Sequence, residues 1–198
     1  WKAGNIKTRQ TIIFDHAAVL APQKVSQFTW EVALRFDPDS MDNFRMGFAQ
    51  AQVSISPSGI VFALVDSTGK ADKNNRLTIS GKLAAAARQQ VYDGQWHHFA
   101  FRLLDTHSGK SELQLWIDGG TSNLFKKEIP FMYSRAGSRF MSEFLPKDHS
   151  TDDCMDELGI WNTALSNEII VTHSLEFFSG DHYHIDFPLI LAVPDIPP

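Results

Sequence analysis

Large apolar residues alternate with small or polar residues along much of this chain. In residues 28–36 every even position is large and apolar, whereas the odd positions between them hold Thr, Glu, Ala and Arg. A period of two predicts a β-strand with one buried face. The same period returns at residues 44–48 and 53–55, and a more uniformly apolar run follows at 60–65. This patterning predicts an all-β fold.

A β-hairpin is predicted near the middle of the chain, where two alternating runs flank a loop that ends in Ser108-Gly109-Lys110. Each run touches an Asp-Gly pair, which is typical of tight turns. Adjacent residues of a strand point to opposite faces, so the hairpin has a core side and an outer side. Alternation gives the core side Phe99, Phe101, Leu103, Leu113, Leu115 and Ile117, and the outer side His98, Ala100, Arg102, Gln114 and Trp116.

The rest of the pattern completes a sandwich. Further strands are predicted at 76–80, 124–129 and 155–161, and Ser166 is a candidate N-cap for one short helix. About a dozen short strands joined by Gly, Pro, Asn and Asp turns predict a two-sheet antiparallel β-sandwich.

We expect one domain over residues 1–178 and a tail over residues 179–198. A single β-sandwich commonly occupies ~200 residues. The tail is apolar and Pro-rich and closes on Pro197-Pro198, which is typical of an extended linker. The sequence therefore predicts that this domain is tethered to further domains of a larger protein.

Four segments, taken in order, resemble one superfamily. They are residues 28–36 (F-T-x-x-x-x-L-x-F), 93–100 (D-G-x-W-H-H-x-A), 113–119 (L-x-L-W-I-D-G) and 155–169 (M-D-E-L-x-I-W-N-x-A-L-S-x-E-I). These motifs, in this order, resemble those of the laminin-G-like and pentraxin-like domains of the concanavalin A-like lectin/glucanase superfamily. The resemblance implies a jelly-roll sandwich that binds a ligand and rarely catalyses. The chain has one cysteine and lacks the carboxy-terminal pair of animal laminin-G domains, so bacterial-type relatives fit better.

Composition narrows the choice of partners. The formal net charge is −5, and the longest basic run is Lys126-Lys127. We expect no nucleic-acid partner, because such binding calls for a basic patch. No apolar run approaches the ~20 residues of a membrane-spanning helix, so we also expect no membrane insertion.

Catalysis is not expected, although the resembled fold also carries glycosidases and lyases. Retaining laminarinase-type enzymes use E-x-D-x-x-E on one strand, which sets two carboxylates ~5 Å apart. This triplet is absent from the sequence, as is the G-x-S-x-G turn of many serine hydrolases. Two alternatives stay open: an atypical polysaccharide-active glycosidase or lyase, and a structural or adhesive accessory domain without its own ligand.

Asp156 is the main candidate metal ligand. Alternation places it on the face of Leu158 and Ile160, at the core side, where a carboxylate needs a partner. The resemblance implies a structural Ca²⁺ held by an Asp at the start of the last strand, and Asp15, at the end of the first strand, is a candidate second ligand. Carboxylate oxygens suit Ca²⁺. The alternative is a carboxylate that accepts hydrogen bonds from backbone N–H groups.

Three other polar motifs are expected to be structural. His97 and His98 are adjacent in a strand and point to opposite faces, so they cannot share one ion without distortion. The acidic loop Asp37–Asn43 lacks the spacing of an EF-hand, and a solvated turn is favoured. His182 and His184 would share a face in an extended tail, which suits a zinc pair, but no further His or Cys lies nearby, so packing is favoured.

The outer side of the hairpin is the candidate ligand-binding face. Its residues are Trp116, Arg102, His98 and Gln114, with Arg35 on a neighbouring strand. Aromatic rings stack on sugars, and the polar groups bond to hydroxyls. Alternatively, a loop or the tail covers Trp116, or the rim loops bind the ligand. We therefore expect a non-catalytic module that binds carbohydrate or an extracellular protein, within a larger secreted or cell-surface protein.

Overall fold

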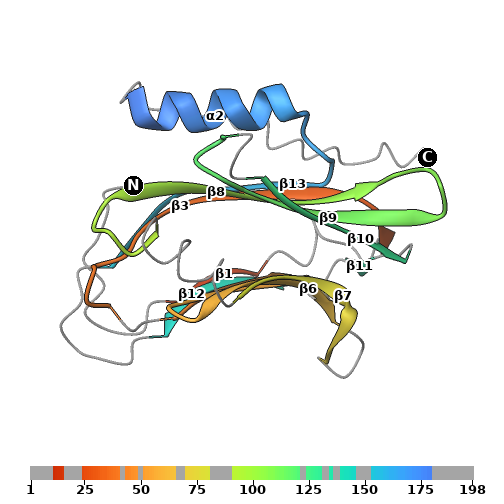
Figure 1. Ribbon diagram of the computed structural model, residues 1–198, viewed down its shortest axis with the longest axis horizontal. Coiled ribbons are helices and arrows are strands. Elements are labelled where there is room, and N and C mark those ends of the chain that lie inside the picture. The colour runs from red at the N-terminus through yellow and green to blue at the C-terminus, as the bar shows by residue number, and fades with distance from the viewer. Residues whose placement is uncertain are drawn as a thin grey trace, which may run out of the picture.

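Two antiparallel sheets pack face to face and form a sandwich (Figure 1). The computed structural model describes residues 11–15, 24–40, 43–48, 51–65, 70–80, 91–120, 124–130, 134–135, 139–145 and 153–179, with the backbone alone in some outer strands, including 11–15 and 139–145. The predicted all-β, two-sheet antiparallel architecture is confirmed. No described helix is long and apolar enough to cross a membrane.

Each sheet joins strands from distant parts of the chain. The six-stranded sheet has the order β1 (Thr11–Asp15), β12 (Arg139–Leu145), β4 (Asn43–Phe48), β5 (Ala51–Ser56), β6 (Gly59–Val65) and β7 (Ala71–Ile79). The five-stranded sheet has the order β10 (Leu124–Pro130), β9 (Lys110–Ile117), β8 (Trp96–Asp105), β3 (Phe28–Arg35) and β13 (Cys154–Trp161). A small sheet pairs β11 (Ser134–Arg135) with β2 (Lys24–Val25).

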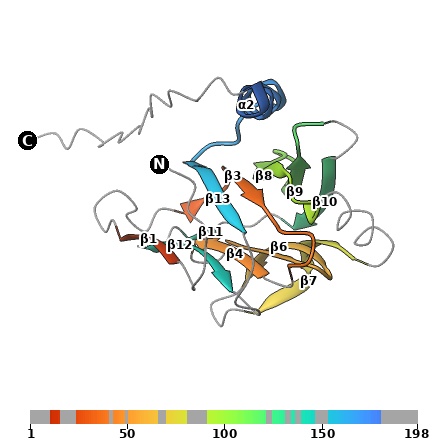
Figure 2. The same cartoon turned by 90° about the vertical axis from the view of Figure 1, so that its left-hand side faces the viewer.

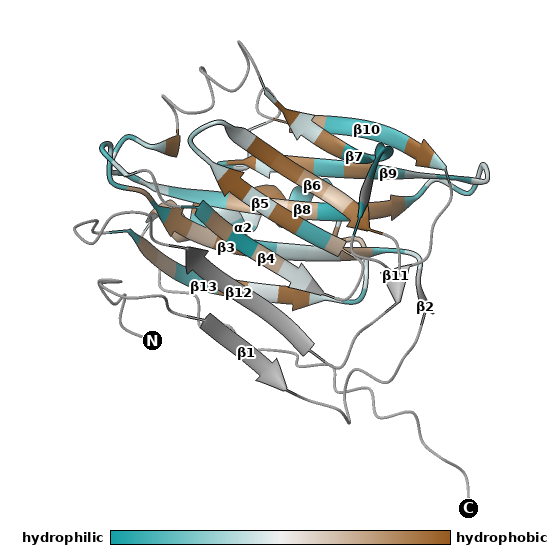
Figure 3. Ribbon diagram, turned by 90° about the horizontal axis from the view of Figure 1, so that it is seen from below, coloured by the Kyte–Doolittle hydropathy of each residue, from teal (hydrophilic) through white to brown (hydrophobic). Residues whose placement is uncertain are grey.

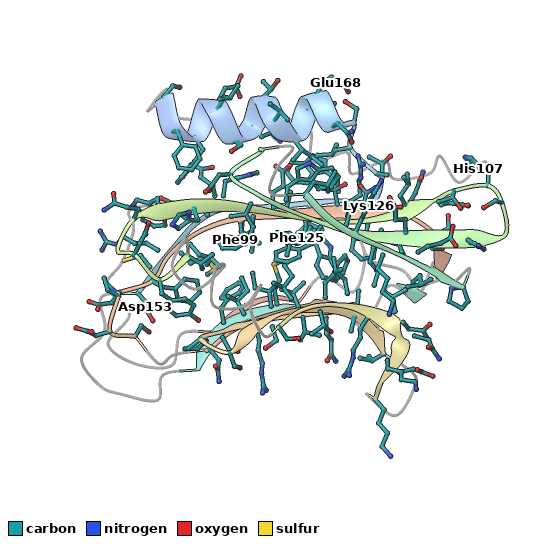
Figure 4. All side chains as sticks on the ribbon, viewed as in Figure 1. Phe99, His107, Phe125, Lys126, Asp153 and Glu168 are labelled. Atoms are coloured by element: carbon teal, nitrogen blue, oxygen red, sulfur yellow. The ribbon has the colours of Figure 1, made fainter. Side chains whose placement is uncertain are left out.

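The main core lies between the two large sheets and consists of the residues that alternation placed inside. Every even position from Phe28 to Phe36 belongs to it, as do the six predicted core residues of the hairpin. Phe62 of β6 meets Phe101 of β8 edge to face, with the ring centroids 5.7 Å apart. Figure 4 shows Phe99 in this space between the layers. The predicted core side of the hairpin is therefore confirmed.

The helix α2 (Asn167–Ser179) lies on the outer side of the five-stranded sheet (Figures 1 and 2). The predicted N-cap is confirmed, because the Ser166 hydroxyl accepts a hydrogen bond from the Ile169 N–H at 3.3 Å. The helix has 13 residues. A second apolar cluster forms beneath it, built from Ala100, Trp116, Leu165 and Ile170, with Leu124 and Trp161 packed against it.

A bulge in β13 overturns the predicted orientation of Asp156. The register shifts after Asp156, where Glu157 has φ 49°. Asp156 pairs with Ala33, next to the core residue Leu34, so Asp156 points to the outer side of the sheet. Leu158 packs against the core instead. The expectation of a core-side Asp156 is wrong because the bulge breaks the period of two.

Candidate functional site

The predicted ligand-binding face lies under α2, and we call it the covered face. Its residues Trp116, Arg102, Gln114 and His98 are only 1%, 5%, 5% and 3% exposed. They do point outward from the sheet, as alternation predicts, but the expectation of an open face is wrong. Trp116 is covered, as the alternative held, but the cover is the helix that follows the last strand of the sheet rather than a loop or the tail.

Arg102 ties the covered face to the segment that leads into α2. Its Nε donates to Gln114 Oε1 and its Nη2 donates to Asn167 Oδ1, both at 2.7 Å, and its Nη1 donates to the Leu165 carbonyl. The guanidinium also lies 4.5 Å from the ring centroid of Trp116. Burial lowers the pKa of Arg102. The side chains of Arg102, Gln114 and Trp116, which were predicted to bind a sugar, are therefore engaged in contacts within the protein.

Arg35 lies at the margin of the covered face and is half-buried. Its Nη2 donates to Cys154 Sγ at 3.3 Å, and its guanidinium lies 5.7 Å from the ring centroid of Trp96. Trp96 in turn meets Phe177 of α2 edge to face at 6.0 Å. Arg35 is therefore placed near the carboxyl end of the helix.

A buried carboxylate on the covered face also contacts α2. His173 Nδ1 lies 2.7 Å from Glu31 Oε2, and His98 Nε2 lies 3.7 Å from the same oxygen. Burial raises the pKa of Glu31, but the hydrogen bonds and charges of the two imidazoles outweigh it, so this pKa is lowered. The hydrogen bond to Glu31 raises the pKa of His173. The arrangement holds the helix on the sheet.

His97 has a separate pair of carboxylate partners, so the two adjacent histidines do not share a site. Its Nδ1 lies 2.9 Å from Asp118 Oδ2, and its Nε2 lies 3.1 Å from Asp93 Oδ1. Burial lowers the pKa of His97, but the two carboxylates outweigh it, so the pKa is raised. Asp118 also accepts a hydrogen bond from the His98 N–H at 3.0 Å. The DGxWHH motif therefore specifies what we call the His97 clamp, in which His97 of β8 bridges Asp93 before that strand and Asp118 after β9.

The acidic loop is held by a carboxylate that sequence analysis did not single out. Asp153 is 1% exposed and accepts hydrogen bonds from the Asp37 N–H at 2.8 Å and the Ser40 hydroxyl at 2.7 Å. Asp37 in turn accepts one from the Asp39 N–H at 2.9 Å. This network fits the expected turn. The sequence signal for Asp153 was its place directly before the last strand.

The calcium prediction stays a prediction. Within the described residues, no group of three or more His, Cys, Asp or Glu side chains has an arrangement that suits a metal ion. Asp156 accepts a hydrogen bond from the N–H of Glu157 at 2.9 Å. The side chain of Asp15 lies outside the described residues, as do His182 and His184. Chelation that lowers the melting temperature would support a bound ion.

The outer face of the six-stranded sheet has no described element over it, and we call it the open face (Figures 1 and 3). Its side chains alternate with core residues along β4, β5, β6 and β7. Strand register aligns them in two rows across the sheet. The first row is Arg45, Ser54, Val61 and Thr78, and the second is Gly47, Gln52, Ala63 and Arg76.

Comparisons with known proteins identify the fold but not a family. No protein-family model and no curated protein matches the chain. The binding domain of botulinum neurotoxin serotype D, solved with N-acetylneuraminic acid, has 13% identity and a TM-score of 0.59, covering 83% of this chain and 39% of that chain. The binding domain of botulinum neurotoxin DC, solved with rat synaptotagmin II, has 10% identity and a TM-score of 0.58, covering 85% and 40%.

A third similar structure comes from another toxin. The binding domain of paraclostridial mosquitocidal protein 1 has 14% identity and a TM-score of 0.57, covering 77% of this chain and 38% of that chain. At these identities the likeness shows a shared sandwich fold. The chain spans about two fifths of the length of the structures it matches.

Proposed function

We propose that this chain is a non-catalytic module that binds a glycan or a protein, within a larger extracellular or cell-surface protein. One contrast carries the proposal. The groups best suited to acid–base chemistry, Glu31, His97 and His98, are buried and hold structural elements together. The open face instead presents hydroxyl, amide and guanidinium groups, which suit recognition.

The solved structures support a binding role. Each of the three is described as a binding domain, one in complex with N-acetylneuraminic acid and one with rat synaptotagmin II. Because the chain matches about two fifths of each, the ligands of those whole chains serve only as a guide to ligand class.

The sequence motifs support a closer relationship to the superfamily that they resemble. The strand segments that resemble laminin-G-like and pentraxin-like domains fall on β3, β8, β9 and β13, which are four of the five strands of one sheet. We propose that the chain is a bacterial-type member of that concanavalin A-like group. The extracellular location rests on this resemblance.

The test is a binding screen of the purified chain against a glycan array that includes neutral and acidic sugars, and against a panel of extracellular proteins. We expect at least one saturable hit that heat-denatured protein does not give. Release of reducing ends from polysaccharide by this chain alone would contradict a non-catalytic role. Two blank screens would favour a structural accessory domain instead.

A further inference from the structure

We propose that the open face binds an acidic polysaccharide, with Arg76 as the main anchor and Arg45 as the second. This inference rests on the proposed binding function and assigns it a surface and a ligand class. Arg76 and Arg45 project from β7 and β4, on opposite sides of β5 and β6.

The charge of these strands differs from that of the whole chain. The protein has 23 acidic and 18 basic residues. The described residues of β4–β7 and their turns (43–48, 51–65, 70–80) contain Arg45, Lys70, Lys73 and Arg76 against the single acid Asp72. That carboxylate already accepts a hydrogen bond from the Asn74 N–H at 2.8 Å. A local excess of positive charge on an acidic protein favours an anionic partner.

The strip between the two arginines suits a sugar chain. Gln52, Ser54 and Thr78 supply amide and hydroxyl groups that bond to sugar hydroxyls. In the second row Gly47 has no side chain, and the small Ala63 is only 3% exposed between its neighbours. Adjacent strands lie ~4.8 Å apart, so the strip from β4 to β7 is about 14 Å wide. A guanidinium fork at each side matches carboxylate or sulfate groups in two-pronged geometry.

The shape of the sheet decides between a polysaccharide and an anionic membrane. Figure 1 shows the six-stranded sheet arched, with the open face on the inside of the arch, and Figure 4 shows side chains extending from this side away from the core. A flat lipid surface cannot follow a concave face, whereas a flexible linear chain can lie in it. A polysaccharide is therefore the partner that fits.

The two arginines are not equivalent. The described segment that holds Arg76 (70–80) also contains Lys70 and Lys73 against the single acid Asp72, whereas Arg45 is the one charged residue of β4, so the positive potential is higher around Arg76. Among the described side chains, the row of Arg76 holds only Gly47, Gln52 and Ala63 besides the arginine, with no acid. Arg76 therefore contributes more to the affinity than Arg45 does.

The experiment is a calorimetric titration of the chain with polygalacturonate (carboxylates), heparin (sulfates) and neutral dextran, alongside vesicles of equal parts phosphatidylserine and phosphatidylcholine. We expect binding to at least one of the two acidic polymers, weakened by added salt, and no binding to dextran or vesicles. Arg76→Gln should weaken the affinity about tenfold or more, and Arg45→Gln less. Lys126→Gln is the matched control, because it removes one exposed positive charge from the other sheet (Figure 4).

Several results would overturn the inference. They are an effect of Lys126→Gln equal to that of Arg76→Gln, equally tight binding of dextran, and binding to vesicles alone. A hit in the glycan or protein screen with no binding to either acidic polymer would remove this inference and leave the proposed function standing. Blank screens together with silent titrations would remove both. Unchanged thermal unfolding of each variant shows that the fold is intact.

Discussion

Arg102 and Arg76 project from the outer faces of the two sheets of one sandwich, yet Arg102 is 5% exposed and Arg76 lies on a face open to solvent. The difference comes from α2, which packs on the five-stranded sheet and has no described counterpart on the six-stranded one (Figure 1). Alternation predicts which side of a strand a residue takes. It does not predict what lies over that side, so a polar outer face can be either a binding surface or the floor of a second core.

The largest expected difference between the faces is in aromatic packing. Trp116→Ala should destabilise the fold by about 3–5 kcal/mol, because it empties the cluster between the sheet and α2. Thr78→Ala on the open face should change the free energy of unfolding by no more than about 0.5 kcal/mol. Urea unfolding measures both. A cost below about 1 kcal/mol for Trp116→Ala would mean that α2 does not cover this face.

The paired arginines give the next comparison. Arg102→Met should cost about 2–3 kcal/mol, because Leu165 O, Gln114 Oε1 and Asn167 Oδ1 lose their donor. Arg76→Met should stay within about 0.5 kcal/mol while weakening acidic-polysaccharide binding. Both variants remove one positive charge, so net charge cannot explain a difference in stability. Equal costs in urea unfolding would contradict the assignment of the two faces.

Strand placement and facing could be predicted from sequence because both follow from a local period of two. Phe99, Phe101 and Leu103 face the core and Arg102 and Trp116 face outward, as alternation requires. Three features depend on tertiary structure and gave weaker signals. They are the helix over the covered face, the bulge that turns Asp156 outward, and the contact of Asp153 with the turn at Asp37.

The sequence did contain an indication that the covered face is buried. Glu31 lies in the middle of an otherwise well-patterned strand, and His98 lies diagonally across from it on β8. Such groups become buried only when partners compensate them. The partner is His173, which is 142 residues away in the chain from Glu31. A single sequence offers no periodic signal over that separation, so the pairing was not predictable.

A substitution at Gly119 tests how closely α2 packs against the sheet. Gly119 has φ 62°, and a Cβ there would lie 2.7 Å from Ser174 Cβ. Gly109 has φ 74°, and a Cβ there would have no neighbour within 4 Å. Both Gly→Ala variants should lose about 1 kcal/mol from backbone strain, and Gly119→Ala about 1 kcal/mol more from the contact. Equal melting temperatures of the two variants would show that α2 yields easily.

The smallest expected effect is the pH dependence of the attachment of α2. The pKa of His173 is raised, so its contribution is complete below pH 6.5 and is lost as the pH rises through the raised value. The pKa of Glu31 is lowered, so its contribution is present above pH 4.5 and is lost as the pH falls through the lowered value. The attachment should therefore be strongest between pH 4.5 and 6.5.

His173→Gln isolates this contribution. Glutamine can still donate a hydrogen bond to Glu31 but cannot gain a proton. Above pH 6.5 the free energy of unfolding of the variant should therefore fall less than that of the parent protein, by at most about 1 kcal/mol. The pKa of His97 is also raised, so the remaining loss of stability with rising pH should persist in the variant.

The measurement is urea unfolding at a series of pH values. Because Trp161 stacks on His173 with the ring centroids 5.6 Å apart, its fluorescence should report the local change. An unaltered pH profile in His173→Gln would show that Glu31 and His173 do not hold the helix as a charged pair, and that the apolar contacts of Ile170 hold it instead.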